Sequence, residues 1–177
     1  MKGMRGFTAL AVSVFVTLSV SCSSDTSTEE EYTMFTKTPE ATSYVIGSAF
    51  KGQLQKDGKP LVNTTVIRRL RWNGNEDGIE QEFTTDENGV FDLPVHEEML
   101  NIPALTEYVG KTDLFAVVDG ERDQFWFLAK MDNAEHSEFD ETPKGVVCEL
   151  NSSIERIEVN HGLGGGKCTW ENMPKEQ

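Results

Sequence analysis

Few residues of this chain could do chemistry, and none shows a spacing typical of a catalytic or metal site. The 177-residue sequence has three histidines, His96, His136 and His161, far apart in the chain and outside any H-x-H or H-E-x-x-H pattern. Ser152 and Ser153 do not lie in a nucleophile elbow. Residues 161–169 lack two of the residues that a P-loop requires. We therefore expect no enzyme activity, no metal and no cofactor.

The three cysteines divide into one near the amino terminus and two near the carboxyl terminus. Residues 1–21 contain Lys2 and Arg5, no acid, and then the apolar run 7–20, an arrangement typical of a secretory signal peptide. The run ends in L-S-V-S-C, which is similar to a bacterial lipobox, although Ser19 stands where that motif prefers leucine. We expect Cys22 to carry a lipid; ordinary cleavage of the signal is the alternative.

An exported chain with two further cysteines is expected to form a disulfide between Cys148 and Cys168. In the chain-entropy account, closing a loop of about 20 residues contributes roughly 3 kcal/mol to stability. The bridge would hold the glycine-rich segment 162–167 against the strand that contains Cys148.

The composition of the next segment predicts a tether between the membrane and a folded domain. Residues 22–43 are rich in Ser, Thr and Glu, so we expect a flexible tether, followed by one domain over residues 44–177. Ser23 after the cysteine is similar to lipoproteins sorted to an outer membrane. We therefore expect a bacterial envelope protein, on the periplasmic face or in the outer membrane, with contact to the membrane only through its lipid.

The stretch 47–95 predicts strands joined by tight turns. Asp57-Gly58 and residues 87–89 (E-N-G) have turn chemistry, and residues 62–72 and 79–85 have the composition and alternation of strands. We expect Trp72 opposite Ile79, which places the arginines of residues 68–71 beside glutamates on a solvated face; a basic binding patch is the alternative. We also expect a hairpin with Phe83 opposite Leu93.

The pattern G-x-L…DGKPL…T-x-V…TTDENGVFDL in this stretch resembles carboxypeptidase-regulatory-like and transthyretin-like β-sandwich domains. The resemblance covers about residues 45–95 and implies a seven-stranded sandwich, but it says almost nothing about activity.

The rest of the chain adds one helical segment and two pairs of strands. Pro103 limits residues 96–108 to one short helical segment. Residues 114–118 and 124–129 predict a hairpin around Asp119-Gly120, with the aromatic run 125–127 as core or, alternatively, as a stacking surface. Residues 146–150 and 154–159 predict the last strands, with Ile154, Ile157 and Val159 buried. Together these elements predict an all-β, seven-stranded Ig-like or transthyretin-like sandwich with one short helical segment.

The protein is strongly acidic. Its formal net charge is −14, and removing Lys2 and Arg5 with the signal takes it to −16. Such a charge argues against nucleic acid as a partner and favours a basic protein. We expect the binding residues in the 119–123 turn and the 132–141 loop, namely Asp119, Glu121, Asp123, Glu138, Asp140 and Glu141; solvated turns are the alternative interpretation.

Two functions fit these features. The first is a protein-binding domain anchored to the envelope, in particular an immunity protein that neutralises an antibacterial toxin; the carboxyl-terminal pattern is similar to small bacterial envelope proteins that we associate with such loci. The second is a glycan-binding or adhesion module, in which Trp72, Trp126 and Trp170 would supply stacking faces. The sequence does not predict the oligomeric state.

Overall fold

The computed structural model describes residues 40–139, 141–157, 159–160 and 162–173, all within the second of two compact units of the chain, Thr38–Gln177. Across these ranges the chain forms strands and no helix, so the predicted all-β sandwich is confirmed. None of the described residues forms a helix that could cross a membrane. The strands are β1 (Thr42–Gly47), β2 (Phe50–Lys56), β3 (Lys59–Pro60), β4 (Thr65–Trp72), β5 (Asn75–Thr84), β6 (Val90–Leu93), β7 (His96–Leu100), β8 (Gly110–Val118), β9 (Glu121–Lys130), β10 (Val146–Glu149), β11 (Glu155–Ile157), β12 (Leu163–Gly166) and β13 (Cys168–Thr169).

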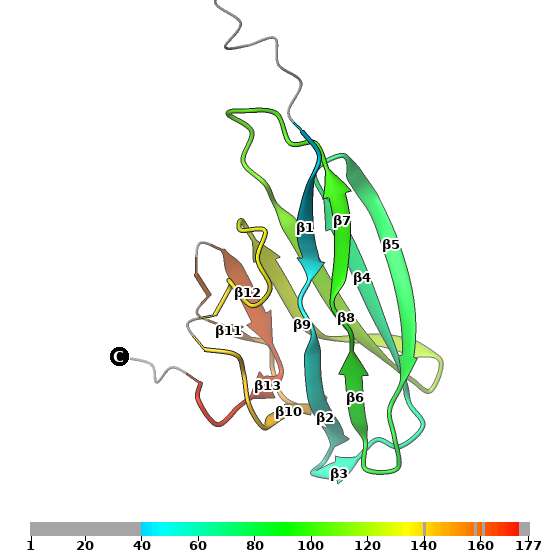
Figure 1. Cartoon of the computed structure of the whole chain (residues 1–177). Helices are drawn as coiled ribbons and strands as arrows, with labels where there is room; N and C mark the ends of the chain where they lie inside the picture. Colours follow the sequence, from blue (N-terminus) through cyan, green and yellow to red (C-terminus); the bar gives the residue numbers. More distant parts are fainter. Residues whose placement is uncertain (1–39, 140, 158, 161, 174–177) are drawn as a thin grey trace, which may run out of the picture. The chain divides into compact units, whose positions relative to one another are not determined.

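The strands form two main sheets and one small ribbon (Figure 1). One sheet has the order β11-β12-β9-β8-β4-β5, and the other has the order β13-β10-β2-β3, with β6 also paired to β2. Strands β1 and β7 form a two-stranded ribbon beyond β2 and β6. The pair β10–β2 is parallel and the other strand pairs are antiparallel.

The core lies between the two main sheets. Alternate residues of β4 point inward, because a strand places every second side chain on the same face. In β9 a register shift opposite Leu114 and Phe115 breaks this alternation, so Phe125 and Trp126 are both buried. Phe127 on the other face is half-buried beneath β12. Phe125 and Trp126 are therefore core, as the first interpretation expected, and Phe127 lies outside the core.

The predicted pairing of β4 with β5 is wrong by two residues. Ile79 lies opposite Leu70, and Trp72 lies opposite Asn75. The residues expected to form a loop continue as a bulged strand, because Gly78 takes a φ of 75° and donates its amide to the Asn75 side chain. Arg69 consequently lies opposite Glu80.

The predicted hairpin between β5 and β6 is also wrong. Strand β6 leaves the six-stranded sheet and pairs with β2, where Leu93 lies opposite Phe50. The Asp86 carboxylate accepts hydrogen bonds from the amides of Asn88 and Val90, which redirects the chain, and Gly89 takes the expected left-handed backbone with a φ of 73°. The crossing buries Phe91 and Leu93 between the sheets, which a hairpin on one sheet would not do.

The expected helical segment over residues 96–108 is not present. Residues 96–100 form β7, because pairing with β1 satisfies the backbone and leaves alternate side chains half-buried. The glycine-rich segment is likewise a strand, β12, whose missing side chains let it lie close to β9: a Cβ at Gly165 would lie 2.5 Å from the Phe127 ring. Of the residues expected to be buried in 154–159, Ile157 is buried, Val159 is half-buried and Ile154 is 41% exposed.

Candidate functional site

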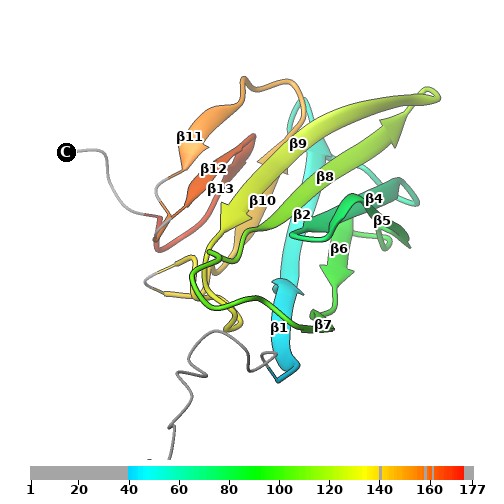
Figure 2. The same cartoon turned by 90° about the horizontal axis from the view of Figure 1, so that it is seen from above.

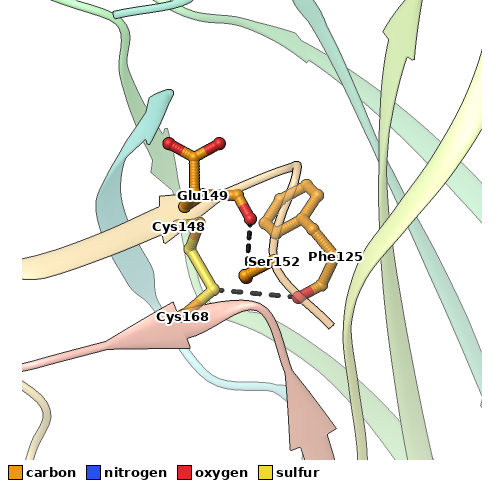
Figure 3. The surroundings of a disulfide bond; sticks show 5 residues. All are labelled: Phe125, Cys148, Glu149, Ser152 and Cys168. Atoms are coloured by element: carbon orange, nitrogen blue, oxygen red, sulfur yellow. Dashed lines mark hydrogen bonds between the residues drawn. A yellow bond between two sulfur atoms is a disulfide. The ribbon is translucent and has the colours of Figure 1, made fainter. Parts of the chain in front are cut away.

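The disulfide predicted from the sequence is confirmed. Cys148 of β10 and Cys168 of β13 lie directly opposite each other, with an S–S distance of 2.08 Å (Figure 3). Both residues are buried, and Cys168 Sγ lies 3.8 Å from the carbonyl oxygen of Phe125 on β9. The bridge therefore ties the last strand to the core. Cys22, the predicted lipid attachment site, lies outside the described residues.

Glu149 follows the disulfide and holds the β2–β3 turn. Its carboxylate accepts hydrogen bonds from the backbone amides of Asp57, Gly58 and Asn151, at 3.0, 2.9 and 3.1 Å. These amides, above all that of Gly58, hold the pKa of Glu149 below its ordinary value. Ser152 donates to the Glu149 carbonyl oxygen at 2.8 Å (Figure 3). This cluster fixes the β2–β3 turn against β10 and contains no arrangement suited to catalysis.

The tip of the β8–β9 hairpin carries two exposed carboxylates. Asp119 and Gly120 have φ values of 54° and 84°, the backbone of a tight hairpin turn with two left-handed residues. The side chains of Asp119 and Glu121 form no hydrogen bond or ion pair with another described residue. We call these two residues the acidic tip. They remain candidates for binding a partner.

The neighbouring charges of the hairpin are paired. Asp123 forms an ion pair with Lys167 at 2.6 Å, and Lys167 also donates to the Leu150 carbonyl oxygen. Arg122 holds the Glu80 carboxylate with two hydrogen bonds, which keep the pKa of Glu80 below its ordinary value. Asp123 is thus engaged within the protein, although its side chain is 40% exposed.

The expectation that Glu138 belongs to an exposed acidic surface is wrong. Its side chain is 2% exposed and forms an ion pair at 3.1 Å with Lys130, which is equally buried. Ser48 donates to its other oxygen at 2.8 Å. A carboxylate in this position is needed to balance a buried ammonium group, so Glu138 is not available to a partner.

The other acids expected in this loop have different outcomes. Glu141 is exposed and accepts a hydrogen bond from the Asn172 side chain at 3.3 Å. Asp140 lies outside the described residues.

The acidic tip and the 131–139 loop lie at opposite ends of β9, about 30 Å apart at roughly 3.3 Å per residue. The predicted binding residues therefore do not form one surface (Figure 2).

The arginine run of β4 also departs from the expected solvated face. Arg68 points into the sandwich and is 1% exposed, donating to Gln81 Oε1 and to the Pro94 carbonyl oxygen. Burial lowers its pKa to about 10. Arg71, on the outer face, is paired with Asp113 at 2.5 Å. Alternation along β4 could have identified Arg68 as inward-facing, because it shares a face with Val66 and Leu70.

A small internal cavity separates these buried charges. It has a volume of about 20 Å³, room for roughly one water molecule, and Arg68, Glu138 and Ser48 are among its lining residues. Glu138 Oε2 lies 3.1 Å from the Lys130 ammonium group and has no further partner within the part of the chain that the structure describes. This space is too small for a substrate.

The tryptophans do not offer stacking faces. Trp72 is 7%, Trp126 2% and Trp170 7% exposed, and Trp126 packs edge-on against Trp170 in the core. The glycan-binding alternative therefore loses the residues on which it rested. His96 contacts Gln81 and Glu98, His136 lies near Glu135, and His161 is not described. No group of metal-binding side chains converges among the residues in the described ranges.

The fold and the bridge define a disulfide-bonded β-sandwich protein. Residues 50–153, more than half of the chain, match the family described as Domain of unknown function (DUF6795), and the chain belongs to that family. The matched segment includes the acidic tip, Lys130, Glu138 and Cys148, and it ends before Cys168. No curated protein and no solved structure matches the chain.

Proposed function

We propose that this chain is an envelope-anchored, non-enzymatic domain that binds a basic protein, and that its role is immunity against an antibacterial toxin. The signal-like residues 1–21 and the lipobox-like sequence around Cys22 support export and anchoring. In this proposal the domain needs no cofactor and contacts the membrane only through its lipid. The resemblance to carboxypeptidase-regulatory-like and transthyretin-like domains would then reflect a shared scaffold.

The acidic tip is the observation that carries the proposal. The other acidic groups of the hairpin have a cation in the same protein, as Asp123 has Lys167 and Asp113 has Arg71. Asp119 and Glu121 have none among the described residues, and the turn between them holds both carboxylates in solvent. Carboxylates held at a rigid hairpin tip can meet lysines or arginines of a partner without first breaking an internal pair.

The net charge supports the same conclusion. With a charge of −14 in 177 residues, the protein attracts cationic surfaces at long range and repels nucleic acid and anionic lipid. Attraction of this kind mainly raises the rate of association, which suits a protein that must intercept a toxin before it acts. The proposal therefore expects binding that weakens as salt is added.

A co-culture experiment tests this proposal even while the toxin is unidentified. Cells that lack the gene are mixed with the parent strain and counted after contact. We expect the cells that lack the gene to decrease in number relative to the parent strain, and expression of the full chain to restore their survival. Equal survival of deleted and parental cells under every growth condition in which the parent makes the protein would overturn the immunity proposal.

Two variants connect the outcome to the acidic tip. Asp119→Lys with Glu121→Lys should restore survival less well than the unaltered chain. Its control is Glu87→Lys with Glu155→Lys, which reverses two other exposed carboxylates. Exposed charges contribute little to stability, so both variants should unfold at nearly the same temperature as the parent protein.

A further inference from the structure

A shallow groove lies at the end of the sandwich opposite the acidic tip. It has a volume of about 440 Å³ and lies between the end of β9, the start of β12 and the loop that follows β7. Its lining residues are Glu107, Ala129, Met131, Asp132, Gly162 and Leu163. We call this feature the groove. Its volume is within the range of sites that hold a large side chain or a small ligand.

The sides of the groove are apolar and open to solvent. Met131 is 41% and Leu163 is 54% exposed. The floor consists of small residues: Ala129 lies opposite Leu163, and a Cβ at Gly162 would collide with the Ala129 carbonyl oxygen. Close approach of the two backbones therefore keeps the groove open between larger side chains.

The loop at one side of the groove displays a further apolar residue in a strained backbone. Leu105 is 96% exposed and has a φ of 74°, a left-handed conformation that leucine rarely adopts. A hydrogen bond from the Thr106 amide to the Pro103 carbonyl oxygen closes the turn at 2.9 Å. Glu107 of the same loop lines the groove. Strain that presents an apolar side chain to solvent is more typical of a contact surface than of a connecting loop.

Two carboxylates border the apolar side chains. Glu107 and Asp132 are exposed, and neither forms an ion pair within the described part of the chain. Asp132 accepts the Ala134 amide at 2.8 Å, and Lys130 donates to the Ala134 carbonyl oxygen at 2.6 Å. The buried Lys130–Glu138 pair thus fixes the loop that carries one side of the groove. A groove already held in place loses little conformational entropy when it binds.

We propose that the groove binds a segment of a protein partner in which one large apolar side chain is flanked by lysine or arginine. The apolar side chain would pack between Met131 and Leu163, and the basic groups would pair with Glu107 and Asp132. This assignment rests on the proposed function and adds a second contact surface for the partner, at the end of the sandwich opposite the acidic tip. Two carboxylates on the border also make an anionic membrane an unfavourable occupant.

Selection from a displayed library of random peptides tests the groove with a defined probe. The target is the full chain purified in detergent. We expect the selected peptides to combine lysine or arginine with one large apolar residue. Met131→Ser with Leu163→Ser should weaken their binding by about tenfold or more, because anchor side chains carry most of the affinity of such contacts. Val62→Ser changes a residue that is 45% exposed on the loop before β4 and serves as the control.

The remaining outcomes separate the groove from the proposed function. Peptides that bind the Met131→Ser, Leu163→Ser variant as well as the parent would overturn the groove while leaving a protein-binding role in place. A selection that yields no peptide, or only acidic ones, would overturn the groove as a site for basic segments. Self-association of the full chain that the double variant abolishes would assign the groove to a second copy of this protein, and vesicle binding that it abolishes would assign it to lipid; both results contradict the proposal.

Discussion

Lys130 and Glu138 form an ion pair at 3.1 Å in which each side chain is only 2% exposed. The pair joins the last residue of β9 to the far end of the 131–139 loop. Lys130 also donates to the Ala134 carbonyl oxygen, and Glu138 accepts from Ser48. Burial, together with the negative charge of Glu138, raises the pKa of the nearby Tyr108. The pair is therefore the point at which this loop is attached to the sandwich.

We expect Glu138→Gln to lower the free energy of unfolding by about 3–5 kcal/mol. The substitution leaves the Lys130 ammonium buried without a countercharge, which costs far more than an exposed pair would. Urea denaturation measures the change. Lys130→Met with Glu138→Leu, which removes both charges, should be less destabilising than Glu138→Gln alone. A loss below about 1 kcal/mol for Glu138→Gln would show that the pair is solvated, as surface pairs are.

Local chemistry predicted the turns and strands of this fold but not which strands are neighbours. Asp57-Gly58, Gly89 and Asp119-Gly120 all have the left-handed backbone that their turn sequences indicate. A strand's alternation defines which face a residue occupies, and shifting the partner by two residues leaves every face unchanged. For this reason the pairing of β4 with β5 was wrong by two residues, and nothing local indicated that β6 pairs with β2.

The candidate site was less predictable than the fold, because burial of charge depends on distant residues. Nothing near Glu138 in the sequence indicates that Lys130 and Ser48 would enclose it. Arg68 was detectable from alternation, because it shares a face with Val66 and Leu70, but an arginine is usually assigned to a solvated face. The groove requires residues from three separate segments, so its existence follows from the topology alone.

Loss of the Cys148–Cys168 disulfide should destabilise the protein by about 2–5 kcal/mol. Cys148→Ser with Cys168→Ser is the change, and thermal or urea unfolding is the measurement. The Cys22→Ser variant is a matched control, since it removes a cysteine outside the bridge and should unfold like the parent. Free thiols at either position in the native protein would contradict the bridge.

Glu149 should make stability depend on pH in the acid range. Its pKa in the folded state is below the ordinary value of 4.5 because the backbone amides of Gly58, Asn151 and Asp57 bond its ionised form. The stabilisation is therefore complete above about pH 4.5 and is lost as pH falls through the folded-state pKa. The difference in unfolding free energy between the parent and Glu149→Gln should shrink over that range.

The control for this titration is Glu87→Gln. Glu87 is exposed on a neighbouring turn and has no hydrogen bond to another described residue. Its substitution should change the unfolding free energy little at any pH. A gap between the parent and Glu149→Gln that stays constant from pH 7 to pH 3 would mean that the amides do not favour the ionised carboxylate.

Cys22→Ser should move the protein from the membrane fraction to the soluble fraction of the envelope. The expectation follows from the signal-like residues 1–21 and from the lipid expected on Cys22. Without that cysteine the protein has no site for the lipid, so its stable attachment to the membrane is lost. Fractionation followed by immunoblotting measures the change. If the parent protein is already soluble, the lipoprotein interpretation is wrong.

Photo-crosslinking in living cells tests the central claim, that this domain binds a protein through the groove, most directly. A photoreactive amino acid is placed at Leu163 in the groove or, as the control, at Val62, which is similarly exposed at 45% compared with 54%. We predict a defined protein adduct from position 163 that is lost when Glu107→Lys and Asp132→Lys are added, and no such adduct from position 62. Equal labelling from both positions, or labelling at 163 that ignores the two charge reversals, would contradict the account.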